Sequence, residues 1–223
     1  MCSVDQKDKD VLVKTTFYIT YVLLITTGTI TLIEAIATKN PQIRHIMNLE
    51  TCISIVAAFF YSKFIAQISS GQISYRDINI TRYSDWFITT PLMLLVLCLV
   101  LSFNDKRYLH ISTFIWILLM NMGMLISGYL GEVKKIDKRT AQIVGFIFFC
   151  VLFGIIWYSF VAGNESFNNL SIYFAFVIVW AIYGVVYMQS EETKNIAYNV
   201  LDVIAKCFIG IFFWMYFTKV IVF

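Results

Sequence analysis

Seven long apolar stretches take up most of this 223-residue chain. Roughly twenty apolar residues in a helix cross a bilayer core of about 30 Å, so each stretch is long enough to span a membrane. We expect spans at Leu12–Thr38, His45–Ile68, Tyr83–Phe103, Leu109–Gly131, Thr140–Ala162, Leu170–Gln189 and Asn195–Thr218. The sequence therefore predicts an all-α membrane protein, a seven-transmembrane helix bundle that forms a single domain over residues 1–223.

The composition agrees, with 59% hydrophobic and 14% charged residues. The apolar runs are too long for β-strands and do not alternate, which argues against a β-barrel. The first span is longer than the apolar part of a signal peptide, so we expect it to be retained. The partner this predicts is the lipid bilayer rather than nucleic acid, and an enzyme is not expected because the spans leave no room for a soluble catalytic domain.

Lys206 lies near the middle of the last apolar stretch, one helical turn after Asp202. A lysine at that depth costs about 2.5–3.5 kcal/mol on insertion scales, so its default interpretation is functional. Residues four apart share a helix face, which places a carboxylate beside the amine. A buried amine with a carboxylate is what Schiff-base chemistry requires.

The third stretch carries a second charged group, with Arg82, Asp85 and Thr89 at steps of three and four. This spacing puts a cation, a carboxylate and a hydroxyl along one helix face. An ion pair at the mouth of an ordinary membrane helix would explain Arg82 and Asp85 equally well.

Cysteine does not point to a site. Four of the five cysteines lie in separate spans, and we expect them to be buried packing residues: Cys52, Cys98, Cys150 and Cys207. Their spacing indicates neither a disulfide framework nor a metal site, so no metal is predicted.

Together, the run Arg-Tyr-x-Asp-Trp-x-x-Thr-Thr-Pro that begins at Arg82 and the run Asp-x-x-x-Lys that ends at Lys206 resemble the microbial rhodopsins. The resemblance covers all seven spans. It implies a seven-helix bundle of that type with an extracellular N-terminus, and all-trans retinal covalently bound to Lys206 as a protonated Schiff base.

The resemblance also implies roles for individual residues. By matching position, Asp85 is the primary counterion and proton acceptor, Asp202 the second counterion, and Arg82 the cation next to them. The positions that match the retinal pocket are Trp86, Thr90, Met93, Asn121, Met124, Gly128, Trp180 and Tyr183. Gly184 stands where the family usually has a proline.

The orientation rules disagree. Eleven Lys and Arg residues lie on the N-terminal side of the expected membrane and five on the other, so the positive-inside rule favours a cytoplasmic N-terminus. We follow the resemblance, which places the N-terminus outside the cell.

Two positions weaken a proton-pump interpretation. Val96 occupies the place where outward pumps of the family carry a carboxylic acid, and an apolar side chain cannot donate a proton. Thr90 and Asn121 match an interhelical hydrogen-bonded pair that controls how quickly the photocycle closes, with an amide in place of the usual carboxylate.

Two other polar positions favour a channel. Glu50 lies in the cytoplasmic half of the second span and Asn199 one turn before Asp202. Buried polar groups in a bundle usually face its interior or a wet cavity, so with Asp85 and Asp202 they would form a path that selects cations by its negative lining. Glu50 would alternatively serve only a hydrogen bond within the bundle. Three threonines of the first span would either complete the path or pack between helices: Thr15, Thr16 and Thr20.

The short loops and the Asn-Leu-Glu-Thr run around Glu50 are most similar to the viral rhodopsins of giant algal viruses. The resemblance then implies a retinal-binding photoreceptor that acts as a light-gated cation channel for monovalent cations or protons. A weak light-driven outward proton pump and a photosensor that signals through a partner protein remain as alternatives. We expect an integral membrane protein of the host cell membrane that forms homo-oligomers, with no preference among dimer, trimer and pentamer.

Overall fold

The computed structural model describes residues 2–70, 74–163 and 166–219, with side chains from residue 11 onward. Seven spans long and apolar enough to cross a membrane lie within these residues. The predicted seven-helix membrane fold is therefore confirmed, and the chain is an integral, multi-pass membrane protein. The helices divide into two compact units, one of residues 1–85 and 189–223 and the other of residues 86–188.

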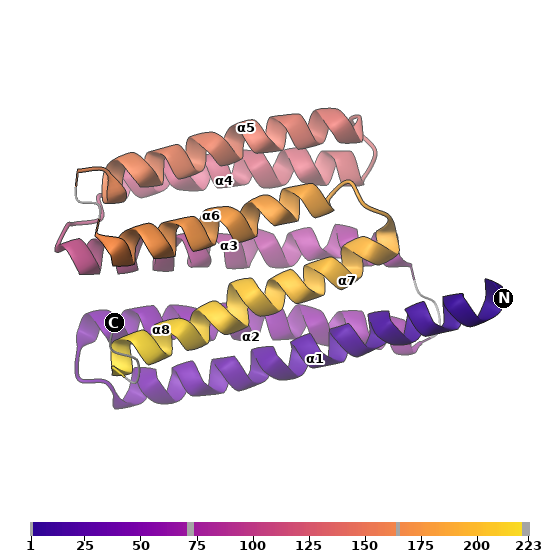
Figure 1. The fold of residues 1–223 in the computed structure, drawn as a ribbon, viewed down its shortest axis with the longest axis horizontal. Helices are drawn as coiled ribbons and strands as arrows, with labels where there is room; N and C mark the ends of the chain where they lie inside the picture. The colour runs from indigo at the N-terminus through magenta and orange to yellow at the C-terminus, as the bar shows by residue number, and fades with distance from the viewer. Residues whose placement is uncertain (1, 71–73, 164–165, 220–223) are drawn as a thin grey trace. The chain divides into compact units, whose positions relative to one another are not determined.

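The first unit contains α1 (Cys2–Ala37), α2 (Pro41–Ser69) and the beginning of α3 (Tyr75–Asp105). Its last span is continuous but has three parts: α7 (Glu191–Asp202), the π-helical turn η2 (Val203–Phe208) and α8 (Ile209–Thr218). Figure 1 shows α1 running beside α2 along most of its length, and the two helices pack closely. The start of α1 and the end of α8 lie at opposite ends of this unit.

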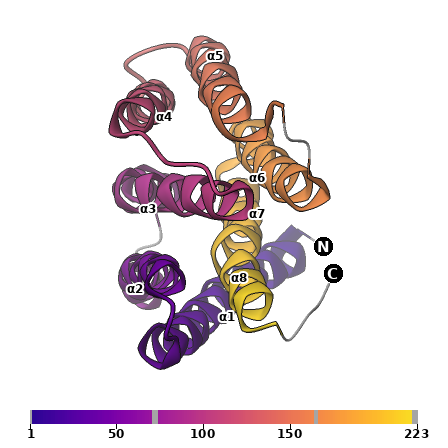
Figure 2. The same ribbon diagram turned by 90° about the vertical axis from the view of Figure 1, so that its left-hand side faces the viewer.

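The second unit contains the rest of α3 together with α4 (Ile111–Glu132), α5 (Lys138–Ile156) and α6 (Phe167–Val186). Viewed along the helices in Figure 2, α4 and α5 lie side by side. α5 ends in a π-helical turn, η1 (Trp157–Val161). The Arg107 guanidinium donates to the carbonyls of Ser159 within this turn and of Ala162 just after it.

Helix starts follow local chemistry. Side-chain oxygens accept hydrogen bonds from the first free backbone amides of four helices, as N-caps do. These caps are Asn40, Asp137, Ser166 and Ser190. Pro41 follows its cap in the first turn of α2, where its missing N–H costs nothing.

The predicted span limits agree with the structure to within four residues, except at the starts of the first and third spans. α1 begins at Cys2 rather than Leu12, and α3 begins at Tyr75 rather than Tyr83. The eight additional residues include Asn79 and Arg82, which are buried and hydrogen-bonded to other helices. Hydropathy underestimates such a segment because it counts these side chains as exposed to lipid, whereas the structure satisfies them internally.

One cysteine prediction was half wrong. Cys98 and Cys207 are buried, but Cys52 and Cys150 face outward. A membrane helix is apolar on every face, so the sequence carries little periodic signal for which face packs inward.

Candidate functional site

Lys206 is fully buried in the π-helical turn η2. Its Nζ lies 2.6 Å from Asp85 Oδ2 and 3.4 Å from Asp202 Oδ1. The predicted meeting of this amine with two carboxylates is therefore present within the first unit. The wider turn, in which the Ile209 N–H bonds back to the Ile204 carbonyl, is a feature found often at functional sites.

Arg82 provides the second cation of the site and is fully buried. Its guanidinium lies 3.5 Å from Asp202 Oδ2. Two cations, Arg82 and Lys206, therefore stand against two carboxylates, Asp85 and Asp202. This balance matters because a buried charge without a partner is strongly destabilising.

Tyr61 of α2 connects these charges. Its hydroxyl donates to Asp202 Oδ2 at 2.8 Å and accepts from Arg82 Nη1 at 3.1 Å. The sequence analysis did not identify Tyr61. A tyrosine in an apolar stretch with many aromatic residues gives no signal before the helices are packed.

Asn199, predicted for the ion path, is a buried junction of hydrogen bonds. Its amide oxygen accepts from Arg82 Nη2, and its Nδ2 donates to the Thr16 hydroxyl at 2.9 Å. The Thr20 hydroxyl reaches the Asn199 carbonyl at 3.2 Å. Thr16 and Thr20 thus join the polar interior, but Thr15 faces outward and donates to the Val11 carbonyl of its own helix.

The polar contacts continue toward the start of α7. Asn195 accepts from Arg82 Nη2 at 3.2 Å and donates to the Glu191 carbonyl at 2.9 Å. The Glu191 side chain, 39% exposed, pairs with the fully buried Lys194 at 3.0 Å and accepts from Asn79 at 2.6 Å. Polar side chains therefore extend from Lys206 to the surface at this end of the unit. The sequence analysis did not identify three of them as members of the site: Glu191, Lys194 and Asn195.

Glu50 is buried on α2, on the other side of Lys206 along the last span. It lies against Gly210 of α8, one turn after Lys206. A Cβ at position 210 would stand 3.1 Å from Glu50 Oε2 and 3.0 Å from Thr27 Cγ2. Glycine at this position makes room for the carboxyl group between α1, α2 and α8.

In the second unit, Thr90 and Asn121 form the predicted interhelical pair. Asn121 Nδ2 donates to Thr90 Oγ1 at 2.9 Å, and Thr90 Oγ1 lies 2.7 Å from the Trp86 carbonyl. A hydroxyl has one proton, so the shorter contact indicates that Thr90 donates to Trp86 and accepts from Asn121. Thr89 and Val96 of the same helix are fully buried.

The aromatic positions predicted for the retinal pocket lie in the same unit. Trp86 meets Tyr183 edge to face, with ring centroids 5.7 Å apart. Trp180 meets Phe153 in the same way at 5.8 Å. Such pairs contribute about 0.5–1.5 kcal/mol beyond burial, so they hold the tryptophans in defined orientations.

The other predicted pocket positions differ in how deeply they are buried. Met93 is buried, and Met124 and Gly128 are partly buried. The Gly128 carbonyl accepts from the Tyr187 hydroxyl at 3.0 Å. At Gly184, where a proline was the expectation from resemblance, α6 continues without a break, and the glycine admits the Phe146 ring of α5.

Comparison with known proteins identifies relatives of the whole fold. The sequence model of the bacteriorhodopsin-like protein family matches residues 12–220. The crystal structure of viral rhodopsin OLPVRII superimposes with a TM-score of 0.90 at 47% identity, covering 95% of this chain and all of that one.

Curated relatives are more distant. The opsin-like protein carO of Fusarium fujikuroi is 25% identical over 153 residues, which are 61% of this chain and 47% of that protein. The green-light absorbing proteorhodopsin of Gamma-proteobacterium EBAC31A08 is 26% identical over 153 residues, 61% of this chain and 60% of that protein. The chain thus spans only about half to three fifths of the length of these relatives.

Proposed function

The chain belongs to the bacteriorhodopsin-like protein family, and from that premise we propose that it is a light-gated cation channel with retinal attached at Lys206. Members of the family bind retinal through a Schiff base to a lysine. The observation that carries the channel assignment is the burial of Glu50 beside Gly210, one turn beyond Lys206.

The surroundings of Lys206 suit a cationic imine. Lys206 Nζ is buried with Asp85 at 2.6 Å and Asp202 at 3.4 Å. When bound, retinal supplies absorption of visible light and a cation at this nitrogen. Asp85 and Asp202 neutralise that cation, and Tyr61 and Arg82 keep Asp202 in place. The positions that the resemblance assigns to the retinal pocket all belong to the second unit: Trp86, Thr90, Met93, Asn121, Met124, Gly128, Trp180 and Tyr183.

Acidic groups occur along the whole first unit. Glu50 lies beyond Lys206 on one side, Asp85 and Asp202 lie beside it, and Glu191 reaches the surface on the other. Together with Asn199 and its threonine partners, they provide a series of oxygen ligands for a monovalent cation or proton. Carboxylates that line a path favour cations by Coulomb attraction.

The second unit offers no proton donor at the position where a pump needs one. Val96 is fully buried and apolar, and the pair of Thr90 with Asn121 contains a hydroxyl and an amide but no carboxyl. Rapid return of a proton from the cytoplasmic side is therefore not supported by these residues, which favours passive conduction.

A voltage-clamp measurement distinguishes these mechanisms. We expect light-induced current in cells that express the protein to reverse sign near the equilibrium potential of the permeant cation. Glu50→Gln keeps the shape and removes the charge, so it should reduce the current or change its cation dependence while the visible absorption band stays near the wild-type position.

Glu34→Gln is the matched control because it makes the same chemical change on a half-buried residue of α1, and we expect wild-type current from it. A wild-type current that keeps its outward sign at all voltages and does not respond to Glu50→Gln would overturn the channel proposal.

A light-driven outward proton pump is the second candidate, favoured by the 2.6 Å contact of Lys206 with the acceptor position Asp85 and by the polar contacts that lead on to Glu191.

We also propose an extracellular N-terminus, a host cell membrane and a homo-oligomeric assembly. Labelling of Cys2 in intact cells with a membrane-impermeant thiol reagent, with Cys2→Ser as the control, tests the orientation. Native mass spectrometry in detergent tests the assembly.

A further inference from the structure

The Arg82 guanidinium is surrounded by four aromatic rings. Its Cζ lies 5.1 Å from the ring centroid of Phe17, 5.2 Å from Phe64, 5.4 Å from Tyr61 and 5.9 Å from Tyr198. All four aromatic residues are buried. We call these four residues the aromatic collar.

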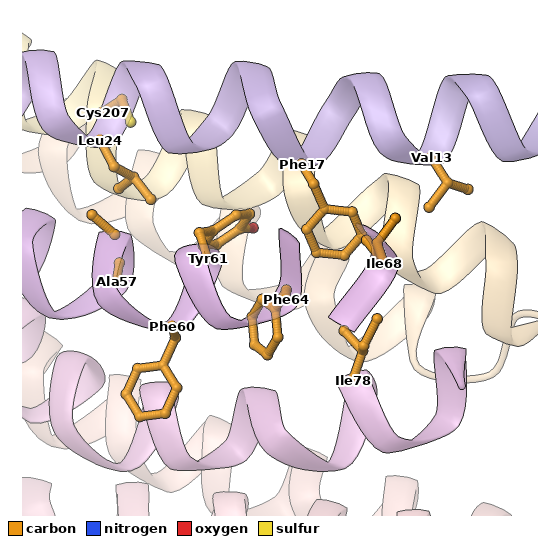
Figure 3. Close-up of a cluster of buried hydrophobic side chains, with 11 residues drawn as sticks. Val13, Phe17, Leu24, Ala57, Phe60, Tyr61, Phe64, Ile68, Ile78 and Cys207 are labelled. Atoms are coloured by element: carbon orange, nitrogen blue, oxygen red, sulfur yellow. The ribbon is translucent and has the colours of Figure 1, made fainter. Parts of the chain in front are cut away.

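The collar rings support one another. Phe17 comes from α1, and Tyr61 and Phe64 come from α2, one turn apart. Their centroids are separated by 5.8 Å for Phe17 and Tyr61, 5.9 Å for Phe17 and Phe64, and 5.6 Å for Tyr61 and Phe64. Figure 3 shows these three rings directed toward one another, with Phe60 of the same cluster pointing away from them.

The three nitrogens of the Arg82 guanidinium differ in their hydrogen bonds. Both terminal nitrogens donate to oxygens of Tyr61, Asn195 and Asn199. The buried Nε–H has no acceptor among the residues that the structure describes. The guanidinium carbon lies close to four aromatic rings, and a cation over ring faces is attracted by the ring quadrupole, most strongly when both are removed from water.

We propose that Phe17 and Phe64 are positioning residues that hold Arg82 stationary beside the counterions. The guanidinium then acts as a fixed charge against Asp202 rather than as an arm that moves between the site and the surface. The proposal goes beyond the channel assignment and does not depend on it, because a fixed Arg82 would serve a pump equally.

An apolar residue of similar volume cannot replace the ring. Leucine fills space but has no quadrupole, so Phe17→Leu or Phe64→Leu removes the attraction that centres the guanidinium. The contact of Lys63 with the Phe59 ring, at 4.4 Å, is different in kind because both residues are exposed.

The first test needs neither transport nor retinal. The chain contains five arginines, so 15N-arginine labelling gives few side-chain signals, and Arg82→Lys identifies the one from Arg82. We expect the wild-type Nε–H resonance to be shifted upfield by the ring currents. Phe17→Leu and Phe64→Leu should move this resonance downfield. Phe64→Tyr keeps an aromatic ring and should leave the resonance near its wild-type position.

The second test follows colour against pH in retinal-bound protein. A cation near a carboxylate favours its ionised form, so a displaced Arg82 lets the counterion protonate at higher pH. We expect the acid colour change of Phe64→Leu to move to higher pH, because the displaced cation no longer favours the ionised carboxylates. Phe64→Tyr should again stay near wild type.

Phe60→Leu is the control, because it removes a ring of the same helix and cluster that makes no contact with Arg82 in the described residues. Wild-type values are expected for both readouts in this variant. An Arg82 signal without ring shift in the wild type, or equal effects of Phe60→Leu and Phe64→Leu, would overturn the proposal. If the leucine variants do not fold, the wild-type and Phe64→Tyr spectra still decide it.

Discussion

The Tyr61 hydroxyl donates to Asp202 Oδ2 across 2.8 Å, which ties α2 to the carboxylate that precedes Lys206 by one turn. The same oxygen accepts from Arg82. One neutral side chain thus contacts a carboxylate and a cation at once. Buried charges are tolerated only when their hydrogen bonds are satisfied in this way.

Removing this hydroxyl should be costly. Tyr61→Phe leaves Asp202 and Arg82 each without one buried hydrogen bond, a loss of about 1–3 kcal/mol. We expect a thermal midpoint several degrees lower and a change in the pH of the acid colour transition, because Asp202, the second carboxylate beside Lys206, loses a donor. Tyr158→Phe, at an 82% exposed tyrosine, is the control and should change neither measurement.

Attachment of the chromophore is tested at Lys206 and Lys194, which are both fully buried. Lys206→Ala should abolish the visible absorption band of protein supplied with all-trans retinal, because it removes the amine that is paired with Asp85 and Asp202. Lys194→Met removes an equally buried lysine and should leave a visible band. A covalent pigment that survives Lys206→Ala would refute the assignment.

The two counterions should differ in how strongly each one affects the absorption of the pigment. Asp85 lies closer to Lys206 Nζ than Asp202 does, at 2.6 Å against 3.4 Å. We therefore expect Asp85→Asn to red-shift the pigment, and acid to produce a similar colour change in the wild type as this carboxylate is protonated. The primary role would move to Asp202 if Asp202→Asn gave the larger shift and Asp85→Asn almost none.

Gly210 offers a test of the space around Glu50. Gly210→Ala adds a Cβ within 3.1 Å of Glu50 Oε2, so the carboxyl group must shift. We expect lower stability and a changed photocurrent with little change in colour. Gly154→Ala is the matched control: nothing lies within 4 Å of its added Cβ, so it should raise the stability by about 0.4–1 kcal/mol. Equal melting temperatures for the two variants would contradict the packing described here.

Much of the architecture follows from the sequence. In lipid every backbone amide must be satisfied within its own helix, so the length of each apolar stretch determines a span without reference to its neighbours. The relation of Asp202 to Lys206 is equally local, because residues four apart share a helix face. The expectation that Asp85 would join them came from resemblance to known sequences.

The partners of these residues were decided only by tertiary structure. Phe17, Tyr61 and Phe64 surround Arg82 because α1 and α2 pack beside the start of α3, and no pattern within any one helix indicates this. Lipid is as apolar as the protein interior, so hydrophobic periodicity does not reveal which face turns inward. That is why Cys52 and Cys150 were misplaced. The early start of α3 was missed because its buried Asn79 and Arg82 are satisfied by another helix, which hydropathy does not show. The spans themselves were found from the sequence alone.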